Sequence, residues 1–266
     1  DPENVPSMRV LEALGFTFES LAREAELIRG EWVDDLRYAL LAADRAAWKV
    51  RPRTPAAEVE LVEITPDDAY LWGRLRTHHS QERFVSPMAL TFRDALFPEV
   101  IDGAPVVPWM RGVLADGERV GFLMLAMVTD HHPEPYMWRL LIDRMHQRRG
   151  LGTQVLAALC AQLRAWGHTT LTTSWGQGLG SPEPFYLAHG FVPTGDIDDE
   201  TRLGSVYLGS LLREQLRLAL RTIAALLLTG YLSARAGGTP VWRSILRNVA
   251  GGLLAMGVTY WIGRLV

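Results

Sequence analysis

The chain has 266 residues, enough for one large domain or for a medium-sized domain with additional segments. Its composition, 48% hydrophobic and 21% charged, is ordinary for a protein with a packed core, and the formal net charge of −3 gives no global indication of nucleic-acid binding. The single cysteine, Cys160, excludes an internal disulfide framework and fits a reducing compartment; inside a helical pattern we expect it to be a core residue.

Composition divides the chain into three segments. Residues 1–52 are rich in Ala, Leu, Glu and Arg and show no signal-peptide pattern; because the first residue is Asp1, we expect a fragment or a product whose start lies upstream. The run at 51–55 contains two prolines and two arginines and is typical of a linker. Residues 59–203 alternate strand-like and helix-like patterns, and 204–266 are strongly apolar with a single acid. We therefore predict three parts with these boundaries.

The first elements of the middle segment are a strand, a helix start and a hairpin. Residues 59–64 alternate like a strand. Thr65 and Pro66 predict a helix, with Thr65 as the N-cap and Pro66 at the first helical position. The apolar runs at 111–114 and 119–128 flank a polar turn, which indicates a β-hairpin.

Strands and helices then alternate to the end of the middle segment. Residues 136–142 predict a strand, and 151–166 carry apolar residues along one helical face. A β-prone run follows at 169–174, and a short aromatic run at 185–187. This order favours an α+β fold with a central mixed sheet flanked by helices.

The sequence Gln-Arg-Arg-Gly-Leu-Gly at 147–152 lies between a predicted strand and a predicted helix. Gly150 and Gly152 allow a sharp turn that presents bare N–H groups, and the positive end of the helix dipole adds to an anion site suited to a pyrophosphate. Arg148 and Arg149 add positive charge. The alternative is a glycine turn before a helix: no Gly-Lys-Ser/Thr follows, and the third glycine of a dinucleotide fingerprint is missing.

The turn with Gln147, Gly150 and Gly152 resembles the acetyl-CoA pyrophosphate loop of the GNAT superfamily of N-acetyltransferases. Four further blocks are similar to the GNAT branch of diamine and polyamine acetyltransferases, and they follow the family's order: 81–85, 138–143, 173–186 and 190–195. The resemblance implies a GNAT fold with a mostly antiparallel sheet over residues 59–203.

The resemblance also implies an activity, the transfer of an acetyl group from acetyl-CoA to a primary amine of a small molecule, with a polyamine as a candidate. Acetyl-CoA would lie along the strand 136–142, where a splayed neighbouring strand exposes backbone N–H groups to the thioester oxygen. The residues that the resemblance assigns to co-substrate binding are Leu140, Leu141, Ile142, Gln147, Arg148, Arg149, Gly150, Leu151, Gly152 and Thr153.

The family's catalytic tyrosine falls on Tyr186. A tyrosine with a pKa near 10 stays protonated at neutral pH and can donate to the departing CoA thiolate. In the alternative, Tyr186 and Phe185 are core aromatics on a helix. The sequence departs from the family pattern at two places. Leu179 stands where many relatives have an asparagine, which concerns a CoA contact, and Asp-Asp-Glu at 198–200 stands where they have Asp-Gly-Glu, which concerns recognition of the amine.

Candidates for the base that deprotonates the amine are Glu134, Glu82, His78 and His79, and we expect Glu134 to take this role unless ordered water relays the proton. Adjacent histidines diverge on a strand or a helix, and no ligand set stands at metal spacing, so we expect no metal site.

The flanking segments carry resemblances of their own. Residues 4–16 are similar to the final helix and turn of ribosomal-protein-type GNAT enzymes, and 30–41 to their last strand. This piece has no pyrophosphate loop, so it predicts the tail of an upstream domain, the remnant of a fusion, or an N-terminal extension that packs on the central sheet.

Residues 216–266 form two apolar runs and predict a helical hairpin. The uncharged stretches, 13 residues between Arg221 and Arg235 and 16 between Arg247 and Arg264, are shorter than the ~20 residues that span a bilayer. The runs resemble the last two membrane helices of the vacuolar iron transporter (VIT) family, whose metal ligands lie on helices that this chain lacks. We expect a cytoplasmic protein attached to the inner face of a membrane, and no transport; a hairpin packed on itself or on a partner is the alternative.

Three functions therefore remain from the sequence. The first is an acetyl-CoA-dependent N-acetyltransferase for a small amine, the second a catalytically inactive acyl-CoA-binding module, and the third a fragment of a membrane transporter fusion. The expected partners are the amine substrate and the membrane, without nucleic acid, and a homodimer stays open.

Overall fold

The computed structural model describes residues 1–101, 103–198 and 201–207. These belong to a compact unit, 1–208, and a second unit comprises 209–266. The predicted apolar hairpin at 216–266 lies outside the described residues.

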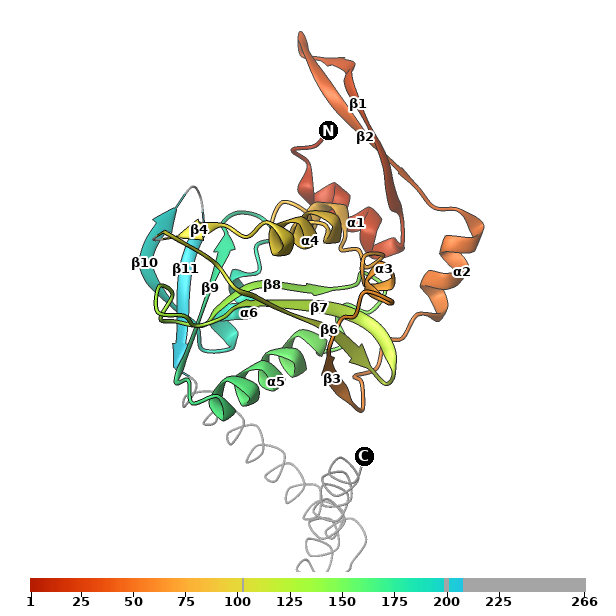
Figure 1. Ribbon diagram of the computed structural model, residues 1–266. Coiled ribbons are helices and arrows are strands. Elements are labelled where there is room, and N and C mark those ends of the chain that lie inside the picture. Colours follow the sequence, from red (N-terminus) through yellow and green to blue (C-terminus); the bar gives the residue numbers. More distant parts are fainter. Residues whose placement is uncertain (102, 199–200, 208–266) are drawn as a thin grey trace, which may run out of the picture. The chain divides into compact units, whose positions relative to one another are not determined.

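Within the described residues, the main sheet has seven strands in the order β10-β11-β9-β8-β7-β6-β3 (Figure 1). All neighbouring strands are antiparallel except β8 and β9, which are parallel. The mixed, mostly antiparallel sheet predicted from the sequence is therefore confirmed. The strands are β3 (Val59–Val62), β6 (Pro108–Ala115), β7 (Glu118–Ala126), β8 (Tyr136–Ile142), β9 (Thr170–Gly176), β10 (Val192–Asp198) and β11 (Thr201–Tyr207).

Helices cover both faces of this sheet (Figure 1). On one face, α5 (Leu151–Ala165) buries the predicted apolar stripe from Leu151 to Leu163. Trp166, the last residue of the predicted stripe, is instead the C-cap and is 38% exposed. On the other face, α3 (Ala69–Trp72) and α4 (Met88–Leu96) contribute to a core cluster with Phe122 and Met124 of β7. Because β7 is covered on both sides, its sequence is almost continuously apolar. Smaller elements are η1 (His79–Gln81), β4 (Val100–Ile101), β5 (Ala104–Pro105) and α6 (Glu183–Ala188).

The start of α3 differs from the prediction. Thr65 is not the N-cap, because the helix begins at Ala69 with Asp68 in the cap position. The Asp68 carboxylate accepts hydrogen bonds from Thr65 N at 2.8 Å, from Thr65 Oγ1 at 2.9 Å and from Trp72 Nε1 at 2.9 Å. A carboxylate can accept all three, whereas a threonine hydroxyl could not, so the acidic side chain organises the turn.

The N-terminal segment forms a helix, a hairpin and a second helix. They are α1 (Val5–Leu14), β1 (Thr17–Ile28), β2 (Glu31–Ala39) and α2 (Ala42–Val50). The helix, turn and strand predicted here are therefore confirmed. In the described structure, β1 and β2 pair with each other and not with the main sheet.

A buried carboxylate joins this segment to the rest of the unit. Glu12, on α1, is 4% exposed. It accepts hydrogen bonds from Ser80 N at 2.9 Å and from Ser80 Oγ at 2.6 Å, and a third from the Tyr38 hydroxyl at 3.3 Å. These hydrogen bonds attach the segment to η1, and β1 and β2 do not pair with the described strands of the main sheet. The origin predicted for the segment, from an upstream domain or a fusion, stays a prediction.

Candidate active site

A cleft of about 510 Å³ opens between β8, β9, η1 and the turn that precedes α5. The two parallel strands explain its origin. They pair only at Tyr136 with Thr172 and at Met137 with Thr173, whereas β8 pairs with β7 along its whole length to Ile142. Beyond Met137 the β9 side of β8 therefore has no ladder partner. Trp138, Arg139, Leu140 and Ile142 of β8 line the opening.

The turn 147–152 forms one end of the cleft. Gly150 has φ +75°, a left-handed conformation that glycine adopts without strain, and it precedes α5 without a side-chain cap. The first N–H groups of this helix of 15 residues therefore lack side-chain acceptors and suit an anion. Gly152 has a further constraint, since a Cβ there would lie 3.2 Å from Cε2 of Phe185. A glycine at 152 lets α6 pack closely against the start of α5.

Gln147 links the turn to η1. Its Nε2 donates to Gln81 Oε1 at 2.9 Å and to Ile142 O at 3.0 Å, and Gln81 Nε2 donates back to Gln147 Oε1 at 3.3 Å. This reciprocal amide pair connects η1 to the turn where β8 ends, and both glutamines line the cleft.

Eight of the ten residues predicted to bind the co-substrate line this cleft: Leu140, Ile142, Gln147, Arg148, Gly150, Leu151, Gly152 and Thr153. The other two lie elsewhere. Leu141 is 2% exposed and packs in the core cluster on the α3–α4 face, because successive strand residues point to opposite faces.

Arg149 is the second exception, since it is 5% exposed and faces the linker. Its Nε donates to Thr54 O at 2.7 Å, its Nη1 donates to His146 Nδ1 at 3.1 Å, and its Nη2 lies 3.6 Å from Asp116 Oδ2. Arg149 therefore joins the linker to the β6–β7 turn, while Arg148 stays at the cleft.

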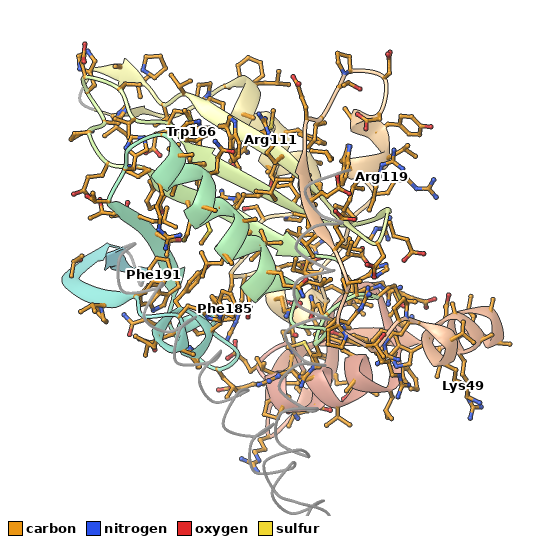
Figure 2. All side chains as sticks on the ribbon, turned by 90° about the horizontal axis from the view of Figure 1, so that it is seen from below. Lys49, Arg111, Arg119, Trp166, Phe185 and Phe191 are labelled. Carbon is orange, nitrogen blue, oxygen red and sulfur yellow. The ribbon has the colours of Figure 1, made fainter. Side chains whose placement is uncertain are left out.

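Tyr186, on α6, both lines the cleft and packs in the core. It is 7% exposed, its ring stacks on Trp175 at 5.3 Å between centroids, and Phe191 meets it edge-on, also at 5.3 Å. Phe185, the preceding residue on α6, also meets the Tyr186 ring edge-on, at 5.3 Å between centroids; Figure 2 labels Phe185 and Phe191. Burial raises the pKa of Tyr186 to about 12, although a hydrogen bond with Thr173 acts in the opposite direction. The hydroxyl is therefore protonated at any physiological pH.

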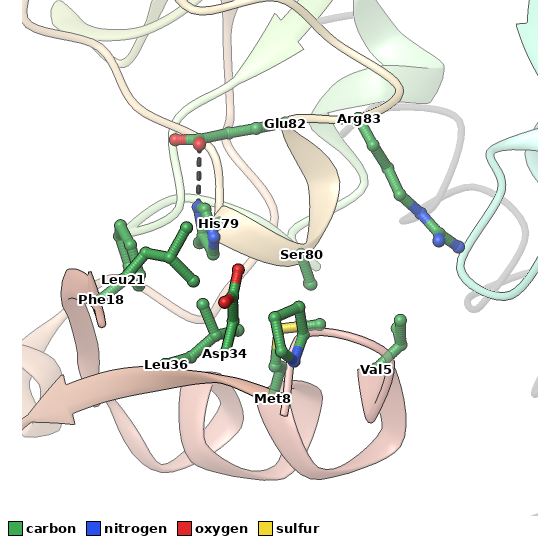
Figure 3. Close-up of a pocket in the computed structure, with 11 residues that line it drawn as sticks. Val5, Met8, Phe18, Leu21, Asp34, Leu36, His79, Ser80, Glu82 and Arg83 are labelled. Atoms are coloured by element: carbon green, nitrogen blue, oxygen red, sulfur yellow. Dashed lines mark hydrogen bonds and ion pairs between the residues drawn. The ribbon is translucent and has the colours of Figure 1, made fainter. Parts of the chain in front are cut away.

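None of the four predicted base candidates lines the cleft. Glu134 is exposed in the loop before β8. His78 lies beside α1 and α2, and burial lowers its pKa. His79 and Glu82 are paired, with Nδ1 2.9 Å from Oε2, and line a separate cavity of about 400 Å³ between η1 and the N-terminal segment (Figure 3). The described residues that line the cleft include no carboxylate.

His146 is a cleft residue that the sequence did not indicate. A guanidinium can only donate, so Nδ1 of His146 accepts from Arg149, and the neutral ring carries its proton on Nε2. Burial lowers the pKa of His146, which keeps the ring neutral at pH 7. Its position just before the turn was the available signal, but the contact with Arg149 arises only in the folded chain.

In the described part of the chain, no group of three or more His, Cys, Asp or Glu residues is placed to hold a metal ion. Within this part of the chain, no helix has the length and apolar character needed to cross a membrane.

Residues 72–191 match the model of the Acetyltransferase (GNAT) family, and residues 206–264 match that of the VIT family. A comparison with curated proteins gave no match. The middle part of the chain is therefore similar in sequence to GNAT acetyltransferases, and its C-terminal part, outside the described residues except for 206–207, is VIT-like in sequence.

Solved structures similar to the chain include three acetyltransferases. An acetyltransferase from Thermus thermophilus has 20% identity and a TM-score of 0.40, covering 56% of this chain and 96% of its own. The PaiA N-acetyltransferase from Thermoplasma acidophilum, in complex with coenzyme A, has 13% identity and a TM-score of 0.40, covering 56% and 99%. A ribosomal-protein alanine N-acetyltransferase from Escherichia coli has 16% identity and a TM-score of 0.41, covering 57% and 94%. Values this low assign no substrate to the chain.

Proposed function

We propose that the chain is an acetyl-CoA-dependent N-acetyltransferase that acylates a primary amine of a small molecule. The family match at 72–191 supports acyl transfer and a CoA thioester as co-substrate. The observation that carries the proposal is the continuity of the cleft. The unpaired edge of β8 leads directly into the uncapped start of α5, and the buried Tyr186 lies in the same cavity.

The residues fit a CoA thioester. The backbone N–H groups at Gly150, Leu151 and Gly152 suit the pyrophosphate, and a side chain at 152 would close the space between α5 and α6. The free edge of β8 beyond Met137 suits the pantetheine arm, which can replace the missing ladder partner, and it offers N–H groups to the thioester oxygen.

In the proposed reaction, the amine nitrogen attacks the thioester carbonyl carbon, a C–N bond forms and the C–S bond breaks. We assign Tyr186 as a hydrogen-bond donor to the departing sulfur. Its pKa of about 12 lies above the ~8.5 of an alkyl thiol, so full proton transfer to the thiolate is unfavourable and the hydroxyl stabilises the negative sulfur by donating. A buried donor is effective because the low dielectric strengthens the hydrogen bond.

The amine must lose a proton, and we assign this step to ordered water that leads to solvent. The reason is that no carboxylate is found among the described residues lining the cleft. Glu134, which the sequence predicts as the base, stays a proposal; the exposed position of this residue requires that the loop before β8 approach the acceptor.

The class of amine substrate follows from the residues that line the cleft. A polyamine carries several positive charges and would be recognised by carboxylates, which the described lining of the cleft lacks. We therefore propose a monoamine ahead of a polyamine. A non-catalytic acyl-CoA-binding module is the second candidate, and the lack of a carboxylate base in the described lining favours it.

The test is an acetylation assay with the full chain, acetyl-CoA and a panel of monoamines, diamines, polyamines and amino acids. Release of free CoA thiol and the mass of the acetylated amine are both measured. Turnover of at least one amine is expected, with monoamines preferred. Tight binding of acetyl-CoA without turnover of any amine in the panel would contradict the proposed enzyme and support the non-catalytic acyl-CoA-binding module.

A further inference from the structure

A third cavity, of about 350 Å³, lies between the N-terminal segment and the turn before α5. Four arginines line it: Arg9 from α1, Arg51 just after α2, and Arg144 and Arg148 from the connection between β8 and α5. Arg9 and Arg51 precede the part of the chain that matches the acetyltransferase family, which begins at residue 72. The cavity thus combines the N-terminal segment with the acetyltransferase domain.

The four guanidinium groups have no ion-pair partner among the described residues. Arg144 Nη1 donates to Thr17 Oγ1 at 3.1 Å, and Arg51 donates to Trp48 O and stacks over the Trp48 ring. Burial, followed by the nearby Arg53, lowers the pKa of Arg51. The cavity therefore holds positive charge that the described side chains leave unneutralised.

The carboxylate that lines the same cavity does not balance this charge. Glu12 is already held by the two groups of Ser80 and by Tyr38. Four guanidinium groups against one carboxylate favour an anionic ligand, and the planar fork of arginine is well matched to a phosphate.

The cavity adjoins the cleft. Gln81, Gln147, Arg148 and Gly180 line both. Gln147 and Arg148 begin the turn that suits a pyrophosphate, so the shared edge lies where the nucleotide end of a bound CoA would leave the cleft. The chemical group at that end is an adenosine with a phosphate monoester on its 3′ oxygen.

We infer that the N-terminal segment completes the co-substrate site: Arg9 and Arg51, together with Arg144 and Arg148, bind the 3′-phosphate of the CoA nucleotide. This inference rests on the proposed function, because it takes CoA as the ligand of the cleft. It gives residues 1–52 a role in binding that the acetyltransferase domain alone would not supply.

The experiment compares CoA with 3′-dephospho-CoA by titration calorimetry on the full chain at constant salt. The variant is Arg9→Gln with Arg51→Gln. The control is Arg45→Gln with Lys49→Gln, which removes the same charge from exposed positions of α2 outside the cavity; Lys49 extends into solvent (Figure 2). Unfolding temperatures are measured for each, and Arg9→Gln alone serves if the double variant does not fold, because Arg9 is exposed on α1.

The parent should bind CoA more tightly than 3′-dephospho-CoA. The variant should lose about 10-fold or more in affinity for CoA, which is the effect of lost charge-assisted hydrogen bonds, and little for 3′-dephospho-CoA. The control should match the parent. Equal losses for the two ligands, or no loss, would overturn the inference and leave the proposed function intact.

Two further results would also overturn the inference. Inorganic phosphate that binds the parent but not the variant, with CoA affinity unchanged, would assign the cavity to a separate anion. A parent that binds neither CoA nor 3′-dephospho-CoA would remove the inference and the proposed function together.

Discussion

At the scale of single residues, Tyr186 has two roles that a substitution can separate. Its ring is packed between Trp175 and Phe191, while its hydroxyl, with a pKa of about 12, belongs to a residue that lines the cleft. Tyr186→Phe keeps the ring and removes the donor to the negative sulfur, so turnover should fall by roughly 10²–10³ with acetyl-CoA affinity near that of the parent. Steady-state kinetics and calorimetry measure the two effects. Parent-like turnover would show that another group stabilises the thiolate.

His78 predicts a pH dependence of stability. Its folded-state pKa is lowered, first by burial, below the ~6.5 of an unfolded chain. Just below pH 6.5 the unfolded chain binds a proton that the folded protein does not, so the free energy of unfolding decreases as the pH falls through this window. Glu12 and Asp143 oppose the shift, whereas Arg144 and Arg148 add to it. His146 shifts in the same direction.

The variant His78→Gln should therefore lose less stability between pH 7 and pH 5 than the parent does. Denaturant unfolding at several pH values checks this expectation, and His131→Gln, at an exposed position, is the matched control. If the free energy of unfolding changes with pH in the same way for the parent and for His78→Gln, His78 does not contribute to the pH dependence of stability.

At the scale of elements, the junction of α5 with its preceding turn can be tested at Gly152. Any side chain there comes close to Phe185, with the new Cβ 3.2 Å from Cε2, so Gly152→Ala and Gly152→Asp share this change in packing. Only the aspartate adds negative charge at the anion site, and it should weaken acetyl-CoA binding by about 10-fold more than the alanine does. Equal affinities in the two variants would exclude the turn from phosphate binding.

Elements with a strong local pattern could be predicted from the sequence. The strand at 136–142, the helix from Leu151 and the hairpin are found in the structure, because each has a clear hydrophobic pattern. The hairpin strands, predicted at 111–114 and 119–128, extend over 108–115 and 118–126. The position of the turn 147–152 between a strand and a helix could be predicted from its glycines. Most of the residues predicted to bind the co-substrate line the cleft. The boundary predicted at 203 falls inside β11, which continues to Tyr207.

What could not be predicted depends on contacts between distant residues. Arg149 follows Arg148 and carries the same charge, but its partners, Thr54 and Asp116, come close only in the folded chain. The Gln81–Gln147 amide pair and the arginine cavity likewise join segments that the sequence keeps far apart.

At the scale of the whole molecule, the N-terminal segment is connected to the cleft through η1. Glu12 holds Ser80, the next residue Gln81 pairs with Gln147, and Gln147 begins the turn before α5. Glu12→Gln replaces a buried acceptor oxygen by an amide donor that faces donors at Ser80, so stability should fall by roughly 1–3 kcal/mol. Acetyl-CoA affinity should fall as well, because η1 supports the turn. Glu3→Gln, at an exposed position of the same segment, is the control.

Thermal unfolding and calorimetry on the same samples check this prediction. A loss of stability without any loss of affinity would mean that the N-terminal segment is attached to the domain but not coupled to the cleft.

The most direct test of the central claim, that the cleft between β8 and β9 is a site for acetyl-CoA, is a crystal structure of the full chain with CoA. We predict the pyrophosphate at the N–H groups of Gly150, Leu151 and Gly152, the pantetheine arm along β8 beyond Met137, and the sulfur at the Tyr186 hydroxyl. CoA bound in the separate cavity beside His79 and Glu82, or an empty cleft at saturating CoA, would contradict this claim.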